Sequence, residues 1–163
     1  MSRYIIGLIM IVVISACRQS PGNTTQLESH IDSLEKKLAA AYKPGLGEFM
    51  SGIQVHHAKL WFAGQQENWP LADFEVHELM ESINDINTYN TDRPEVKQLP
   101  MIKTPLDSIN AAITQKNAAL FKRSFVLLTN TCNNCHQVTS HGFNIIKIPD
   151  TPPFTNQDFG VKK

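Results

Sequence analysis

The run Thr131-Cys132-Asn133-Asn134-Cys135-His136, near the end of the last predicted helix, constrains this chain more than any other stretch. Residues at positions i, i+3 and i+4 are neighbours on a helix, so the two thiols and the imidazole share one face. This pattern is typical of c-type haem attachment, in which two thioethers hold the porphyrin and the histidine binds the iron. We therefore expect haem c to be bound covalently through Cys132 and Cys135, with His136 as the proximal iron ligand.

Two other uses of the same motif stay open. The cysteine pair could be a redox dithiol, or it could be half of a zinc site completed by His136 and His141. The chain has only three cysteines, so there is no second pair, and no thioredoxin-like alternation of strands and helices surrounds this one. These observations favour haem.

The first 16 residues predict a lipoprotein signal peptide. Arg3 precedes an apolar run, from Tyr4 to Ile14, that is short for a membrane span. Ile14-Ser15-Ala16-Cys17 resembles a bacterial lipobox, which implies that Cys17 is lipidated and becomes the first residue of the mature protein. An ordinary signal peptide cut near Ala16 and an uncleaved anchor are the alternatives. We expect a lipid-anchored protein on the periplasmic side of a bacterial membrane, whether inner or outer.

Composition predicts a single folded domain behind a tether. The chain has 163 residues, is 42% hydrophobic and carries a formal net charge of zero, which gives no basic face for nucleic acid. Residues 17–25 are mostly small and polar and predict a flexible tether. Neither a Ser-His-Asp set nor a phosphate-binding loop stands out, so we expect no enzymatic activity.

Apolar residues at helical spacing predict an all-α fold. An extra helix over 26–43 comes first, and an antiparallel four-helix bundle with covalently bound haem covers 46–139. The bundle helices run from Leu46 to about 64–68, from an Asn68 cap to about Asn87, from Thr104 to a break near 115–117, and from there through the haem motif; 88–103 is a crossing loop. Residues 140–163 form an extended tail that lies over the bundle or the haem edge, or is a partly disordered end.

Two helix faces suggest partners. The extra helix carries an apolar stripe that could pack on the same chain or pair with a second copy as a homodimer: Leu27, Ile31, Leu34, Leu38 and Ala41. The outer face of the helix after Asn68 is acidic and consists of Asp73, Glu75, Glu78, Glu81 and Asp85. Such a face is usually only solvated, but it could also dock a basic redox partner protein.

From Leu46 to Thr139 the chain resembles the cytochrome c prime family, the class II c-type cytochromes. The haem motif stands at the end of the last helix, and 111–117, Ala-Ala-Ile-Thr-Gln-Lys-Asn, is similar to the family's turn before that helix. The resemblance implies a four-helix bundle around haem. The extra helix, the tail and the His56-His57 pair depart from classical members and suggest a lipoprotein branch of the family.

The sixth iron ligand is open from sequence. If the first and last bundle helices are antiparallel, His136 lies level with the start of the first, where a rise of about 1.5 Å per residue puts Met50 about 6 Å in and His57 about 16 Å in. Some relatives place methionine there, while others leave the iron five-coordinate. We expect Met50, with His57, His56, His141 or an open site as alternatives.

These features predict a membrane-tethered c-type cytochrome that carries electrons to an unknown redox partner protein. The alternative is a haem protein that binds or senses NO or CO at an open or weakly ligated iron. A zinc-binding or scaffolding lipoprotein is the alternative without haem.

Overall fold

The computed structural model describes residues 21–161, which contain five α-helices, one 3-10 helix and no strand. The elements are α2 (Pro21–Ala39), α3 (Leu46–Gln65), α4 (Trp69–Tyr89), η1 (Pro94–Ile102), α5 (Lys103–Thr114) and α6 (Ala118–Val138). The all-α prediction is therefore confirmed for this part of the chain. The signal peptide, the lipobox with Cys17 and residues 17–20 of the expected tether lie outside it. The chain divides into two compact units, one ending at Tyr42 and the other beginning at Lys43.

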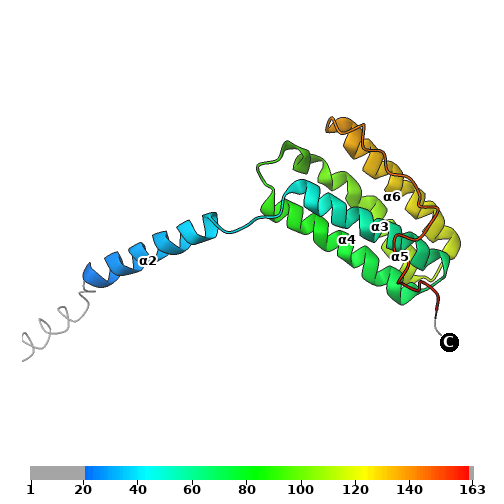
Figure 1. Ribbon diagram of the computed structural model, residues 1–163, viewed down its shortest axis with the longest axis horizontal. Helices are drawn as coiled ribbons and strands as arrows, with labels where there is room; N and C mark the ends of the chain where they lie inside the picture. The colour runs from blue at the N-terminus through cyan, green and yellow to red at the C-terminus, as the bar shows by residue number, and fades with distance from the viewer. Residues whose placement is uncertain (1–20, 162–163) are drawn as a thin grey trace, which may run out of the picture. The chain divides into compact units, whose positions relative to one another are not determined.

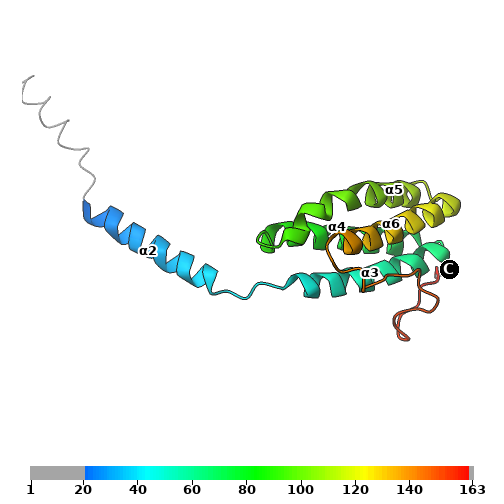
Figure 2. The same ribbon diagram turned by 90° about the horizontal axis from the view of Figure 1, so that it is seen from above.

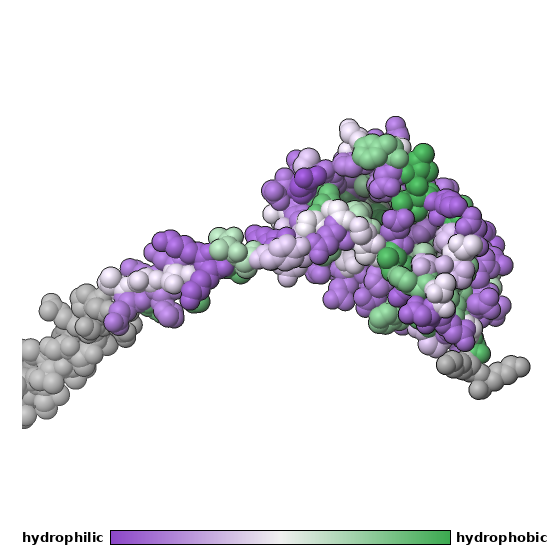
Figure 3. Space-filling model, viewed as in Figure 1, coloured by the Kyte–Doolittle hydropathy of each residue, from purple (hydrophilic) through white to green (hydrophobic). Residues whose placement is uncertain are grey.

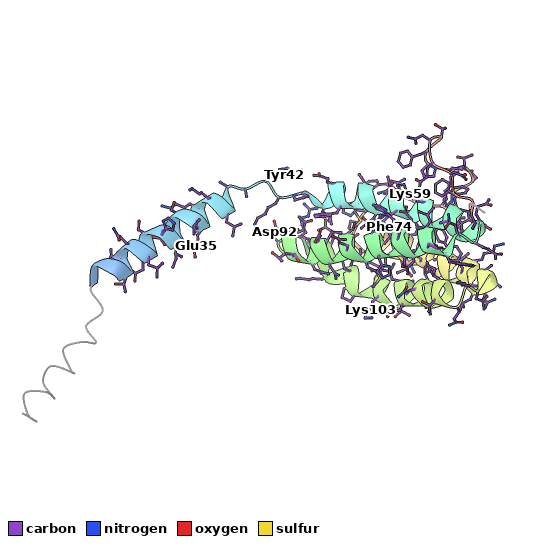
Figure 4. All side chains as sticks on the ribbon, turned by 90° about the horizontal axis from the view of Figure 1, so that it is seen from below. Glu35, Tyr42, Lys59, Phe74, Asp92 and Lys103 are labelled. Atoms are coloured by element: carbon purple, nitrogen blue, oxygen red, sulfur yellow. The ribbon has the colours of Figure 1, made fainter. Side chains whose placement is uncertain are left out.

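The first unit contains α2, which begins earlier than expected. Residues 21–25 were predicted to belong to the tether, but they are helical, because proline is well tolerated in the first turn of a helix. The helix also ends earlier, at Ala39. Its side chains project on all sides (Figure 4), and the predicted apolar stripe is exposed at Leu27, Ile31, Leu34 and Leu38. Pairing of this stripe with a second copy stays a prediction.

In the second unit, α3, α4, α5 and α6 pack as a helical bundle (Figures 1 and 2). Residues 66–68 join α3 to α4 and residues 115–117 join α5 to α6, and connections this short make consecutive helices antiparallel. Asparagine caps the helix after each connection. The Asn68 side chain accepts from the Leu71 N–H at 3.4 Å, and the Asn117 side chain accepts from the Leu120 N–H at 2.9 Å.

The core contains the apolar residues that helical spacing pointed inward, together with a group of stacked aromatic rings. Phe121 and Phe125 of α6 are fully buried, and their ring centroids lie 6.4 and 4.8 Å from that of Trp61 on α3. Gly64 lets α3 approach α6 at this point, since a Cβ there would lie 2.1 Å from the Phe121 ring. The bundle is therefore packed tightly at the end away from residues 132–136.

The prediction that Glu75 belongs to an acidic outer face of α4 is wrong. This carboxylate is only 1% exposed, and its Oε2 lies 2.7 Å from His56 Nδ1. Lys59 Nζ is 3.9 Å from Oε1. Since α3 brings both basic side chains to the α3–α4 interface, Glu75 is charge-paired inside it rather than solvated. The predicted crossing loop differs too, because η1 occupies most of it.

The tail after Ser140 has no regular secondary structure, but it lies along the bundle (Figures 1 and 2). Phe159 is buried, and its ring centroid lies 5.7 Å from that of Phe62. The Asn68 side chain donates to the Phe159 and Gly160 carbonyls, each at 3.2 Å. Lys59, which Figure 4 shows on the side of α3 where the tail lies, contacts the Phe154 ring at 5.4 Å. The tail therefore covers the outer side of α3.

The face of the molecule seen in Figure 3 is mostly hydrophilic, with hydrophobic residues in small separate areas. Among residues 21–161, the helices are all too short or too polar to cross a membrane.

Candidate functional site

The Cys132-x-x-Cys135-His136 motif opens onto two adjoining cavities of about 180 and 260 Å³. The residues that line both cavities are Gly47, Met50, Leu99, Cys135, His136 and Asn144. Cys132, Ile53 and His57 line only the first cavity, while Arg93 and His141 line only the second. The start of α3, the end of α6, η1 and the tail therefore converge on one site.

Both cysteines of the motif are free thiols on the cavity wall. Cys132 packs against the apolar core, and burial, with a smaller effect of Cys135, raises the pKa of its thiol to about 12. Burial also raises the pKa of Cys135. Because thiolates are the nucleophiles of disulfide exchange, two protonated thiols do not favour a redox dithiol.

The tail decides the tautomer of His136. Its Nδ1 lies 2.7 Å from the Asn144 carbonyl oxygen, and because a carbonyl can only accept, Nδ1 must carry the proton. The lone pair is then on Nε2. This is the arrangement in which histidines bind metals, with one ring nitrogen held by an acceptor and the other free to ligate.

Met50 and His136 lie on facing elements and line both cavities. The structure thus brings together the two residues that the antiparallel geometry predicted to be level. A thioether sulfur has no proton to lose before it binds a metal, so Met50 can act as a ligand without a change of protonation.

His57 is held by α6 through one ring nitrogen. Its Nε2 lies 2.9 Å from Thr129 Oγ1, and that hydroxyl already donates to the Phe125 carbonyl at 3.0 Å. A hydroxyl has one proton, so Thr129 accepts and His57 Nε2 donates. Burial lowers the pKa of His57 to about 4, which keeps the ring neutral.

The other two histidine candidates differ in position. His56 is not part of either cavity wall and faces Glu75 instead, at 2.7 Å. His141 lines the second cavity, with Nδ1 donating to the Thr139 carbonyl at 2.7 Å. Its backbone N–H bonds to the His136 carbonyl at 2.7 Å, so His141 comes from the same stretch as His136 rather than from the facing helix.

Sequence reasoning missed η1, and it expected the tail over the bundle or the haem edge without naming the tail residues that contribute. Leu99 of η1 and Asn144 of the tail line both cavities, and neither belongs to a recognisable pattern. Arg93, just before η1, donates to Glu95 at 2.7 Å beside the second cavity.

No cluster of three or more histidine, cysteine, aspartate or glutamate residues within 21–161 is arranged to hold a metal ion by itself. No known family model, curated protein or solved structure matches this chain. The chemistry of the cavity therefore carries the functional proposal.

Proposed function

We propose that this protein is a membrane-tethered c-type cytochrome in which α3, α4, α5 and α6 form a four-helix bundle like that of the cytochrome c prime family. The observation that carries the proposal is that Cys132, Cys135 and His136 open onto the cavity region that Met50 lines from α3. Haem c would supply one-electron chemistry at its iron.

The residues present fit haem on three counts. Two free thiols at helical spacing can form two thioethers, and the His136 imidazole next to them has its Nε2 lone pair available. The surrounding wall is largely apolar, with Ile53, Leu99 and Ile146 among its residues, as a porphyrin face requires. Zinc would have to be held by the two cysteines with His136 and His141, and no such ligand group is assembled.

Covalent attachment is tested by acid-acetone extraction of protein matured with haem. The pigment should stay with the protein, and Cys132→Ala with Cys135→Ala should give a largely haem-free and less stable bundle. Haem that extracts freely, or a protein that contains zinc instead, would refute the proposal.

Met50 as the sixth ligand favours electron transfer, because a thioether stabilises ferrous iron and raises the potential. The support is its place on both cavity walls, whereas His57 lines only the first cavity and His56, which pairs with Glu75, lines neither. The oxidised protein should show the weak far-red charge-transfer band of methionine-ligated haem, and Met50→Ala should abolish it and open the iron to CO.

Gas binding is the second candidate, and the second cavity beside Met50 and His136 favours it. If the iron has no sixth protein ligand, the unmodified protein should be high-spin and bind CO or NO without mutation. A spectrum that Met50→Ala leaves unchanged would assign Met50 to packing and make His141→Ala the next variant.

The tether and the partner complete the proposal. Cys17 would carry the lipid that holds the domain at the periplasmic side of a bacterial membrane, so Cys17→Ser should release the protein from membrane fractions. A basic redox partner would meet the acidic residues of α4 other than Glu75, which is buried in the α3–α4 interface.

A further inference from the structure

Asn133, one of the two residues between the motif cysteines, joins α6 to the tail. Its side-chain Nδ2 donates to the Ile146 carbonyl at 2.7 Å, and its Oδ1 accepts from the Ile146 N–H at 2.7 Å. Both ends of the amide are therefore used on the backbone of a single tail residue. Asn134, the other residue between the cysteines, is exposed.

This two-point contact fixes the register of the tail over the site. Ile146 and Ile148 turn toward the bundle, where Ile148 packs against the core, while Ile145 before them is 76% exposed and Lys147 between them is also exposed. Alternating residues of an extended chain point in opposite directions, so a slip by one position would exchange these faces. Asn133 bonds to the backbone at Ile146, and these two bonds add to apolar packing in fixing which tail residues face the bundle.

The segment held in this way carries the hydrogen-bond acceptor of His136. The Asn144 carbonyl, two residues before Ile146, receives the His136 Nδ1–H at 2.7 Å, and the Asn144 N–H bonds to the His141 carbonyl at 2.8 Å. The carbonyl is thus fixed from both sides, by a turn at His141 and by the Asn133 contact. An acceptor at Nδ1 orients the ring and increases the basicity of Nε2.

We propose that Asn133 is a positioning residue for the iron-binding histidine, because it holds the tail carbonyl that orients and polarises His136. This inference rests on the proposed function, and it gives the tail a part in setting the potential of the site. A more basic axial imidazole stabilises ferric iron, so loss of the Nδ1 acceptor should raise the midpoint potential.

The test compares matched variants at neighbouring positions in the full-length, haem-matured protein: Asn133→Ala with Asn134→Ala, and Asn133→Asp with Asn134→Asp. The aspartate pair is nearly isosteric and controls for the added charge. The readouts are the midpoint potential by redox titration and backbone hydrogen exchange of the tail by mass spectrometry. Covalently bound haem is measured in the same samples.

In Asn133→Ala the Ile146 region should exchange about thirtyfold faster, since two hydrogen bonds that each contribute about 1 kcal/mol are lost, and in Asn133→Asp it should exchange faster by a smaller factor. The midpoint potential of Asn133→Ala should be higher than that of Asn134→Ala, and that of Asn133→Asp should be higher than that of Asn134→Asp. Equal potentials in the Asn133 and Asn134 variants, or unchanged exchange, would overturn the inference while leaving the cytochrome proposal intact. Failure of only the Asn133 variants to bind haem would also overturn it, since Asn133 would then serve attachment. Absence of covalent haem from all samples, the unmodified protein included, would refute the proposed function and this inference with it.

Discussion

Replacement of Gly64 by alanine tests the close contact of α3 and α6 with a control in the same helix. A Cβ at Gly64 would lie 2.1 Å from two ring atoms of Phe121, whereas a Cβ at Gly52 would meet nothing within 4 Å. The Phe121 ring is fully buried beside Trp61 and Trp69, so it has no free space to move into. The two substitutions are chemically identical, and only their surroundings differ.

The two substitutions should change the free energy of unfolding in opposite directions. Gly52→Ala should stabilise the protein by about 0.5–1 kcal/mol through helix propensity. Gly64→Ala should destabilise it by about 1–3 kcal/mol, the usual cost of overpacking a filled core. The two variants should therefore differ by about 1.5–4 kcal/mol in urea unfolding followed by the helical circular dichroism signal.

A double variant identifies the cause. If the clash with the ring is responsible, Gly64→Ala should cost much less in a Phe121→Leu background, because the two residues are in direct contact and their effects are not additive. Gly64→Ala that is as stable as Gly52→Ala would refute the packing described for this end of the bundle. So would a cost that Phe121→Leu leaves unchanged.

Two further predictions concern buried polar groups. The pKa of His57 is lowered from 6.5 to about 4, so the unfolded chain takes up this proton first as the pH falls, and about 3 kcal/mol of stability should be lost between pH 6.5 and 4. Urea unfolding across that range should show a shallower loss for His57→Gln, and parallel curves would contradict the assignment. Glu75→Gln should lower the free energy of unfolding by about 1–3 kcal/mol, because it removes the charge that His56 and Lys59 face at the α3–α4 interface. Asp73→Gln, at an exposed position of α4, is the control and should have little effect.

Much of the fold could be predicted because its signals are local. The helices of the second unit follow from apolar spacing and from caps such as Asn68, whose side chain needs only the next turn of its own helix to act. The break at 115–117 is likewise a property of a few adjacent residues. The motif at Cys132, Cys135 and His136 predicts a haem site for the same reason, since its three side chains share one helical face.

The structure brought other residues together that no local pattern connects. Glu75 has the spacing of an exposed acidic residue, and it is buried only because α3 presents His56 and Lys59 to it. The tautomer of His57 also depended on a distant partner, since its Nε2–H is bonded to Thr129, 72 positions away.

The sequence by itself determined the chemistry that this protein can offer: two thiols, an imidazole and a methionine on helices whose order makes them meet. Only the tertiary structure decided which atoms of those groups are available. The proton on His136 Nδ1 and the lone pair on Nε2 follow from the Asn144 carbonyl, which the tail delivers through the contact of Asn133 with Ile146. A hydrogen bond between segments apart in the chain depends on the packing of the whole bundle, because no short stretch of residues specifies where another one will lie.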